Sequence, residues 1–231
     1  MFFLKFGILF FYLKKHQFQN KKHYKKMAKS KNKRKKKRSV QTPKRLTPEQ
    51  YIFQKARSLP IAKVYMSDEE AIEEGICSIF ILREQPSGTY ILGIFLVDLF
   101  CLGVKDAFYR FGITRDDFAE YLEHYNSNGA TLEETSPEYA HGIIKSSLEY
   151  AAKFGIQPHK GFKLAQYILN DMKTVKKANI RHPKVPKYLT LRASYNPLVI
   201  AALNKSVGAG NYEIGIKDER FIGEWDMQDD Y

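Results

Sequence analysis

The stretch GICSIFILREQPSGTYILGIFLVDLFCLG, residues 75–103, decides the fold. It contains two runs rich in Ile, Leu, Phe and Val, separated by the turn sequence Pro86-Ser87-Gly88. Branched and aromatic residues favour strands, and turn residues between two such runs are typical of a hairpin. The sequence therefore predicts a β-hairpin with strands at about 76–84 and 89–98. Both runs are almost continuously apolar, which predicts that both faces of the strands are covered.

Two capping boxes precede the hairpin and predict helices there. Thr47-Pro48-Glu49-Gln50 has the capping residues of a helix start and predicts a helix to about Ser58, before Pro60. Ser67-Asp68-Glu69-Glu70 has the same pattern and predicts a short acidic helix that ends at Gly75.

The chain after the hairpin is mainly of helical character. Capping residues and apolar residues at helical spacing predict helices at about 115–126, 136–154, 162–172 and 196–208, and two short apolar runs predict strands near 188–192 and 211–216. The sequence thus predicts an α+β fold, with a central β-hairpin or small antiparallel sheet packed with about five helices. We expect residues 46–231 to form a single domain, preceded by a disordered basic tail.

The positive charge of the chain is concentrated at its N-terminus. Residues 1–45 contain 17 of the 38 Lys and Arg residues and no Asp or Glu, so residues 46–231 carry 21 basic and 25 acidic side chains. Between Lys29 and Arg38, eight of ten residues are basic. Such a run repels itself and buries no apolar surface, so residues 27–45 are predicted to be disordered. Because the remainder is mildly acidic, we expect affinity for polyanions to reside in the first 45 residues.

The first 26 residues differ in character from this tail. MFFLKFGILFFYLKK, at residues 1–15, is apolar over fewer positions than the roughly 20 that a membrane-spanning helix needs. Its basic cluster follows the apolar run, which is the wrong order for a signal peptide. Met27 opens the sequence MAKSKNKRKKKR, so we expect translation to start there and residues 1–26 to be an upstream in-frame extension. The alternative is an apolar stub that anchors the chain at a membrane interface.

Two cysteines are too few for a disulfide framework or for a zinc site made of cysteine alone. Cys77 and Cys101 both lie in strongly apolar surroundings. They are therefore predicted to be free, buried thiols of a protein in a reducing compartment, the cytoplasm. No cofactor is predicted.

Two segments carry a resemblance to a protein family. VDLFCLGVKDAFY (97–109) and EYAAKFGIQPHKGF (149–162) resemble an uncharacterised family of small bacterial cytosolic proteins with VDLxCLGVKD-like and GFxPHKDF-like motifs. YIFQKARSLPIAKVY (51–65) and VGAGNY (207–212) are similar to the opening and the glycine-rich C-terminal part of that family. The resemblance implies a shared fold and no established activity. Gly161 stands where the family pattern has Asp, so any role of that carboxylate would be weakened or absent.

Asp98 and Asp106 are candidate catalytic acids at the end of the hairpin and just beyond it. A carboxylate at the end of an apolar strand is a common position for an active-site acid. It is equally a position where Asp accepts hydrogen bonds from the backbone of the following turn. A buried pairing between one of these Asp side chains and Lys105 is a further alternative, and we favour these structural roles.

His141 and His159 are the other candidate acid–base residues. His141 and Glu149 are eight residues apart in a predicted helix, and His159 lies in the turn after it. Two histidines with carboxylates could hold a metal or act as acid and base. Their spacing matches no familiar metal pattern, so no metal site is predicted. Tyr109 and Phe111 could stack on an unpaired base, although core packing is favoured for both.

The sequence favours a nucleic-acid-binding accessory protein associated with RNA or the ribosome; it leaves enzymatic activity open, with a non-enzymatic role favoured. The residues predicted to contact phosphates are basic side chains of the tail: Lys29, Lys31, Lys33, Arg34, Lys35, Lys36, Lys37, Arg38, Lys44 and Arg45. Tyr24 is the aromatic residue nearest this run, so the tail offers little base stacking. The alternatives are a protein-interaction or regulatory adaptor and, behind it, a metal-dependent hydrolase or nuclease. A membrane partner is not expected, and the sequence does not predict the oligomeric state.

Overall fold

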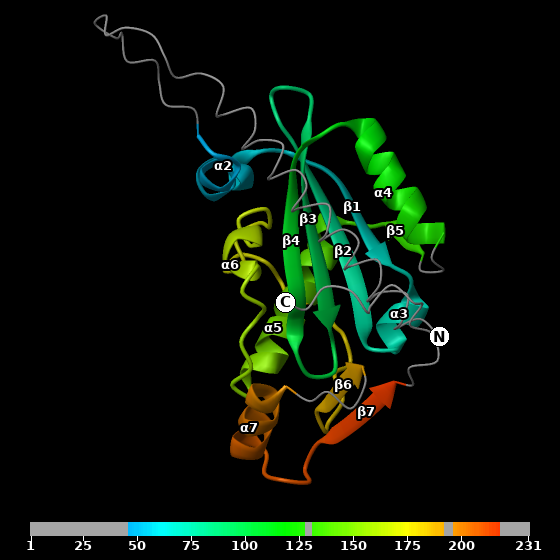
Figure 1. Cartoon of the computed structure of the whole chain (residues 1–231), viewed down its shortest axis with the longest axis vertical. Coiled ribbons are helices and arrows are strands. Elements are labelled where there is room, and N and C mark those ends of the chain that lie inside the picture. The colour runs from blue at the N-terminus through cyan, green and yellow to red at the C-terminus, as the bar shows by residue number, and fades with distance from the viewer. Residues whose placement is uncertain (1–45, 128–130, 192–195, 218–231) are drawn as a thin grey trace, which may run out of the picture.

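The protein has the predicted α+β fold, built on one antiparallel sheet. A computed structural model describes residues 46–127, 131–191 and 196–217, and within these ranges it contains a five-stranded sheet, a two-stranded sheet and six α-helices (Figure 1). The strand order of the large sheet is β4-β3-β2-β1-β5. The predicted tail and the residues before it lie outside the described part.

The predicted hairpin is confirmed at the centre of this sheet. Its strands are β2 (Ile76–Glu84) and β3 (Tyr90–Asp98), paired without a register shift from Ile76↔Asp98 to Glu84↔Tyr90. Successive side chains of a strand point to opposite faces. Ile79 and Ile81 accordingly join one hydrophobic cluster, while Phe80 and Leu82 join another. Both faces of the hairpin are covered, as its continuous apolar character predicts.

Three strands that the sequence analysis did not predict extend the hairpin into a sheet. β1 (Ile61–Ser67) pairs with β2, β4 (Gly103–Ile113) pairs with β3, and β5 (Leu132–Glu134) pairs with β1. β4 carries three charged residues, which conceal its strand character. One of them, Arg110, is buried and lies over the rings of Phe108 and Tyr121, 5.7 and 5.8 Å from their centroids.

The helices follow the predicted order. They are α2 (Pro48–Lys55, continued by a 3-10 turn at Ala56–Ser58), α3 (Glu69–Glu73), α4 (Arg115–Ser127), α5 (Pro137–Ala152), α6 (Phe162–Ala165) and α7 (Pro197–Ser206). The Thr47–Gln50 capping box of α2 is present in both directions. Ser136 and Asn196 cap α5 and α7 with their side-chain oxygens.

The start of α3 differs from the prediction by one residue. Asp68, not Ser67, is the N-cap, because its carboxylate accepts a hydrogen bond from the Ala71 amide at 3.0 Å. The Ser67 hydroxyl accepts from the amide of Ser78 at 2.9 Å and so belongs to the sheet. The predicted end of the helix at Gly75 holds, since Gly75 follows the C-cap Glu74 with a φ of 86°.

The helix predicted at 162–172 is wrong beyond its first turn. α6 ends at Ala165, and turns follow it. Backbone carbonyls that would accept the next hydrogen bonds of the helix accept hydrogen bonds from arginine side chains of other elements instead. Arg57 donates to the carbonyls of Gln166 and Leu169, and Arg83 donates to that of Ile168.

The elements form three layers with the sheet in the middle. α2, α5 and α6 contribute to the hydrophobic cluster on one face of the sheet, and α3 and α4 contribute to the cluster on the other face. In Figure 1, α5 and α6 lie toward the left of the sheet and α3 and α4 toward its right.

A smaller C-terminal unit packs at one end of the sheet. The strands β6 (Lys187–Leu191) and β7 (Glu213–Lys217) pair in parallel, and both coincide with the predicted strands to within about two residues. A third cluster, which includes Cys101, Tyr150 and Leu203, joins this unit to the end of α5.

Candidate nucleic-acid interface

The residues predicted to contact phosphates, from Lys29 to Arg45, lie outside the described residues. The folded part must therefore be assessed on its own side chains. Two kinds of feature stand out there: small clusters of polar residues around the sheet, and a surface of exposed lysines and arginines.

Asp98 has the structural role that the sequence favoured. Its side chain is fully buried, and its Oδ1 accepts hydrogen bonds from the amides of Phe100 (2.9 Å) and Cys101 (2.8 Å). Burial raises the pKa of Asp98, and the positive charge of Lys105 and these backbone bonds oppose that rise. Burial likewise lowers the pKa of Lys105. This arrangement fixes the turn between β3 and β4.

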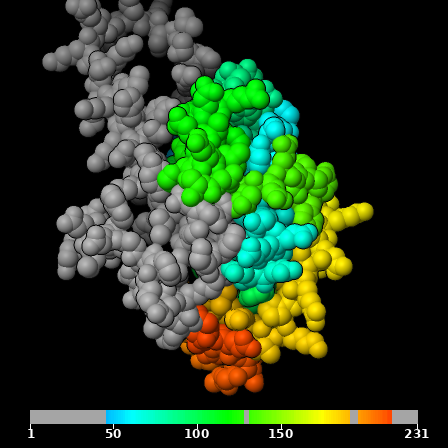
Figure 2. All heavy atoms as spheres, turned by 90° about the vertical axis from the view of Figure 1, so that its right-hand side faces the viewer, coloured from blue at the N-terminus to red at the C-terminus, as the bar shows by residue number. Residues whose placement is uncertain are grey.

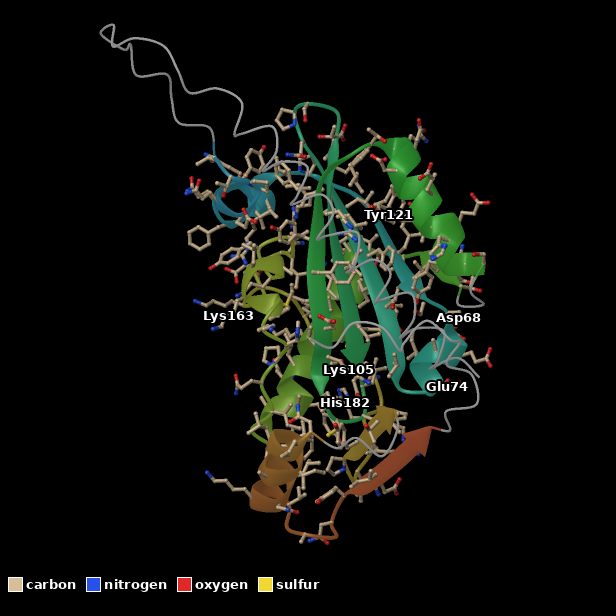
Figure 3. The ribbon with its side chains drawn as sticks, in the orientation of Figure 1. Asp68, Glu74, Lys105, Tyr121, Lys163 and His182 are labelled. Carbon is tan, nitrogen blue, oxygen red and sulfur yellow. The ribbon has the colours of Figure 1, made fainter. Side chains whose placement is uncertain are left out.

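His182 and Tyr150 lie beside this turn, and neither was predicted from the sequence. The His182 ring stacks on Tyr150, with 4.3 Å between ring centroids and 2° between ring planes. Its Nδ1 is 2.7 Å from the carbonyl oxygen of Leu99, and its Nε2 is 2.9 Å from the hydroxyl of Ser146. Both nitrogens are thus engaged, and burial lowers the pKa of His182. Lys105 and His182 lie at the same end of the sheet (Figure 3).

Asp106 and His159 form a separate pair. Their Oδ1 and Nδ1 atoms are 2.8 Å apart, and both side chains are partly exposed. The backbone before His159 is fixed to the sheet, because the His159 amide donates to the carbonyl of Val104 at 3.0 Å. The nearby Gly161 has no room for a side chain, since a Cβ there would lie 2.0 Å from the carbonyl oxygen of Ala107. The Asp of the family pattern does not fit this geometry.

His141 and Glu149 are not part of a common site with His159. The Nδ1 of His141 bonds to the carbonyl of Pro137, and its Nε2 accepts from the amide of Asn170 at 3.1 Å. Burial lowers the pKa of His141, so the ring is a neutral link between two segments. Glu149 forms an exposed ion pair with Lys177 at 2.7 Å.

The candidate acids and bases are therefore distributed over three separate arrangements. Among the described residues, no group of three or more His, Cys, Asp or Glu side chains could hold a metal ion. Cys77 and Cys101 are both free and buried, as predicted. Burial raises the pKa of each thiol to about 12, so both are protonated at neutral pH. This geometry offers no assembled catalytic centre in the described part of the chain.

The exposed charges of the folded part are strongly segregated. Residues 145–187 contain ten Lys or Arg and two Asp or Glu, whereas residues 68–134 contain four Lys or Arg and fourteen Asp or Glu. The mildly acidic average of residues 46–231 hides this separation. A count by segment, rather than over the whole domain, would have shown it in the sequence.

Seven exposed cations form what we call the basic surface. None of them has an ion pair within the described ranges: Lys153, Lys160, Lys163, Lys173, Lys176, Arg181 and Lys184. Lys163 of α6 lies at the left of Figure 3. Most of these residues come from the irregular segment between α6 and β6.

This segment is held against the outer side of α5 by hydrogen bonds to its backbone. Lys145 donates to the carbonyl of Val175 at 2.6 Å, and the Tyr150 hydroxyl donates to that of Pro183 at 2.8 Å. Gly142 allows a close approach, because a Cβ there would lie 2.8 Å from the amide of Ala178. The lysines of the segment are therefore displayed on the α5–α6 side of the sheet.

The opposite side of the sheet carries the acidic residues. α3 and its flanks contribute Asp68, Glu69, Glu70, Glu73 and Glu74, and α4 contributes Asp116, Asp117, Glu120 and Glu123. In Figure 2 the yellow atoms of the basic segment lie along the right edge, and the green atoms of α4 lie away from them toward the upper left. The folded part thus presents positive charge on one side of its sheet and negative charge on the other.

Tyr109 and Phe111 are not available to a base in this geometry. The Tyr109 hydroxyl donates to Glu49 at 2.9 Å, and the Phe111 ring meets the edge of Tyr51 with 5.4 Å between centroids. Both side chains thus pack against α2, as the core alternative predicted.

Comparisons with protein-family models, with curated proteins and with solved structures give no match for this chain. The family resemblance at residues 97–109 and 149–162 therefore stays a prediction. Within the described residues, no helix combines the length and the apolar character needed to cross a membrane.

Proposed function

We propose that the protein is an RNA-binding accessory protein, associated with RNA or the ribosome, that uses the basic N-terminal tail and the basic surface together. The observation that carries the proposal is the basic surface itself: seven exposed cations without ion-pair partners in the described part, collected on one side of a domain with a net acidic composition. Lysine and arginine contacts with phosphates supply affinity without sequence specificity by releasing bound counterions.

The position of α2 supports a joint role for the tail and this surface. The described chain begins at Leu46, immediately before α2, and α2 packs against α6. The Phe53 ring of α2 meets the Tyr167 ring with 4.7 Å between centroids, and Arg57 bonds to the carbonyls of Gln166 and Leu169. The tail therefore joins the fold on the side that carries Lys160 and Lys163. A polyanion held by the tail is brought next to further positive charge.

The acidic side of the sheet restricts which face of the protein bound RNA contacts. Negative side chains on α3 and α4 repel phosphates at close range, although salt screens this repulsion beyond about 8–10 Å. RNA is therefore expected to follow the α5–α6 side. Binding through about four to six phosphate contacts should weaken by orders of magnitude between low and moderate salt.

A protein-binding adaptor is the second candidate, and one observation favours it. Leu198 on α7 is 80% exposed, and Val185 and Ile214 of the same C-terminal unit are also exposed. Exposed apolar side chains that form one patch are typical of protein contacts, and all three of these belong to one small unit. The two functions are compatible, because this unit lies at the other end of the sheet from α2 (Figure 1).

The experiment that tests the proposal compares three full-length proteins for binding to fluorescein-labelled total cellular RNA by anisotropy. The first is the wild type. The second replaces Lys163, Lys173, Lys176 and Arg181 by Gln, and the third, a matched control, replaces Glu69, Glu73, Asp116 and Glu120 by Gln. We expect the second protein to lose about tenfold or more in affinity at low salt, and the control to bind as well as the wild type or better. Absence of RNA binding by the wild type would contradict the proposal.

A further inference from the structure

Phe53 is an apolar ring exposed to solvent on the basic side of the fold. It lies on α2, directly after the fully buried Ile52, and 57% of its surface is exposed. Tyr139, at 43%, is the other large exposed aromatic residue of the described part. Single exposed apolar residues are common, so the exposure of Phe53 alone identifies no site. The side chains around Phe53 supply the further evidence for a site.

The Phe53 ring is held in place by neighbouring planar groups. The ring of Tyr167 meets it at an interplanar angle of 67°, and the Arg57 guanidinium lies 5.2 Å from the Tyr167 centroid. Arg57 is itself fixed, because its Nε and Nη2 donate to the carbonyls of Leu169 (3.4 Å) and Gln166 (3.3 Å). Phe53 therefore packs against a side chain that has partners of its own, while more than half of the Phe53 surface stays exposed.

This ring lies on the helix that follows the basic tail in the chain, and it touches Tyr167, which follows α6. The basic tail joins α2 five residues before the helix reaches Phe53, since α2 begins at Pro48. Tyr167, whose ring meets that of Phe53, follows α6, and α6 carries Lys163. A polynucleotide that runs from the tail to the basic surface passes α2 and its exposed ring.

We propose that the RNA bound by this protein is single-stranded and that an unpaired base stacks on Phe53. The inference rests on the proposed RNA-binding function and specifies its ligand. Aromatic side chains beside a positively charged path bind unpaired bases, because every base has a flat face and the contact needs no particular sequence. In a duplex the base faces are already stacked on each other, so the ring would contribute nothing to binding.

The test measures the affinity of the full-length protein for two RNA probes by anisotropy. One probe is a 12-nucleotide oligouridine, and the other is a duplex with the same number of phosphates. The variants are Phe53→Ala, Phe53→Leu, which keeps apolar volume without a flat ring, and Phe53→Trp, which keeps a ring. Tyr139→Ala is the matched control, an exposed aromatic residue near the start of α5 and next to Glu138.

We expect Phe53→Ala and Phe53→Leu to lose about tenfold in affinity for oligouridine and to bind the duplex like the wild type. Phe53→Trp should bind oligouridine at least as tightly as the wild type, and Tyr139→Ala should change neither affinity. Equal affinities of wild type and Phe53→Ala for oligouridine, while both proteins still bind, would overturn the stacking inference and leave the proposed function standing. Failure of the wild type to bind either probe would overturn both.

Discussion

The β2–β3 hairpin and the segment from Lys153 to Lys187 are stabilised in opposite ways. In the hairpin, every residue from Ile76 to Arg83 and from Ile91 to Asp98 is buried, and a continuous backbone ladder joins the two strands. Segment 153–187 contains the four-residue α6 and otherwise little regular structure before β6. Its backbone is held by side chains of other elements, among them Arg57, Arg83 and Lys145.

The hairpin therefore contributes mainly to stability, and the segment contributes mainly exposed charge. An apolar hairpin is stabilised by burial of both faces, and it leaves no room for exposed cations. A segment anchored at a few carbonyl groups can expose most of its side chains and still keep a defined position. Substitutions can therefore perturb the two regions separately.

The largest effect is expected for Arg83, which belongs to the hairpin and anchors the segment. It is 2% exposed, donates to the carbonyls of Ile168 and Leu59, and bonds to Asn170 Oδ1 at 2.8 Å. Arg83→Ala leaves these buried acceptors without a donor, which should cost about 4 kcal/mol of the free energy of unfolding. Urea denaturation measures this value, and limited proteolysis should show earlier cleavage between residues 166 and 187.

A control for this prediction is Lys173→Ala, which changes an exposed cation of the same segment. It should alter the free energy of unfolding by less than about 0.5 kcal/mol. If Arg83→Ala were equally mild, the segment would not depend on this anchor.

Gly161 tests the close contact between the segment and β4. Gly161→Asp must displace either the chain near His159 or the carbonyl of Ala107, and we expect a loss of about 2–3 kcal/mol in thermal or urea unfolding. Gly155→Ala is the matched control, because a Cβ at Gly155 meets nothing within 4 Å and only its φ of 72° is unfavourable. That control should lose about 1 kcal/mol. A tolerated Gly161→Asp would show that this contact is looser than described.

The sequence predicted the hairpin better than the segment for a physical reason. Burial of both faces leaves a local signature, because it requires apolar residues at consecutive positions. The strand β4 lacked that signature, since Lys105, Asp106 and Arg110 interrupt its apolar run. Asp106 and Arg110 are accommodated by His159 and Tyr121, which belong to other elements of the fold. No local pattern reveals such partners.

In the candidate site, too, the sequence predicted local contacts and missed contacts between distant segments. Asp98 was predicted to cap its turn because the residues involved, Phe100 and Cys101, are its neighbours in the chain. The helix expected after Phe162 failed because Arg57 and Arg83, about 80 or more residues away, bond to carbonyls that the helix would have used. Charge segregation was present in the sequence, but an average over residues 46–231 concealed it.

Asp98 offers a smaller perturbation at the end of the hairpin. Asp98→Ala removes the acceptor for the amides of Phe100 and Cys101 and should cost about 2 kcal/mol in urea denaturation. Asp98→Asn keeps an acceptor oxygen and removes a buried charge, so it should cost clearly less. Neither variant should change RNA affinity. A large loss of affinity in Asp98→Asn with intact folding would instead give this carboxylate a functional role.

The buried histidines should make the free energy of unfolding mildly dependent on pH. Burial lowers the pKa of His141 and of His182 below the ordinary value of 6.5 in the folded state. The unfolded chain therefore binds protons first as the pH falls, so stability is full above about pH 6.5 and decreases below it, by at most about 1.4 kcal/mol per pH unit for each group.

Urea denaturation at several pH values between 7.5 and 5 measures this dependence. His182→Gln should be less stable than the wild type at pH 7.5, because the Leu99 and Ser146 bonds are altered, and should show a weaker pH dependence. Identical pH dependence in both proteins would mean that His182 is not held neutral by the fold.

The central claim is that the tail and the basic surface contact the same RNA. The most direct measurement is the salt dependence of affinity for the oligouridine probe in four full-length proteins: wild type, tail-neutralised (all eight cations between Lys29 and Arg38 changed to Gln), surface-neutralised (Lys163, Lys173, Lys176 and Arg181 changed to Gln), and the combination. We predict that surface neutralisation lowers the slope of log affinity against log salt by about 2–3 relative to the wild type. Tail neutralisation should lower this slope by more than surface neutralisation does, and the combined variant should hardly bind. A surface-neutralised protein with the slope of the wild type would contradict the claim and confine RNA binding to the tail.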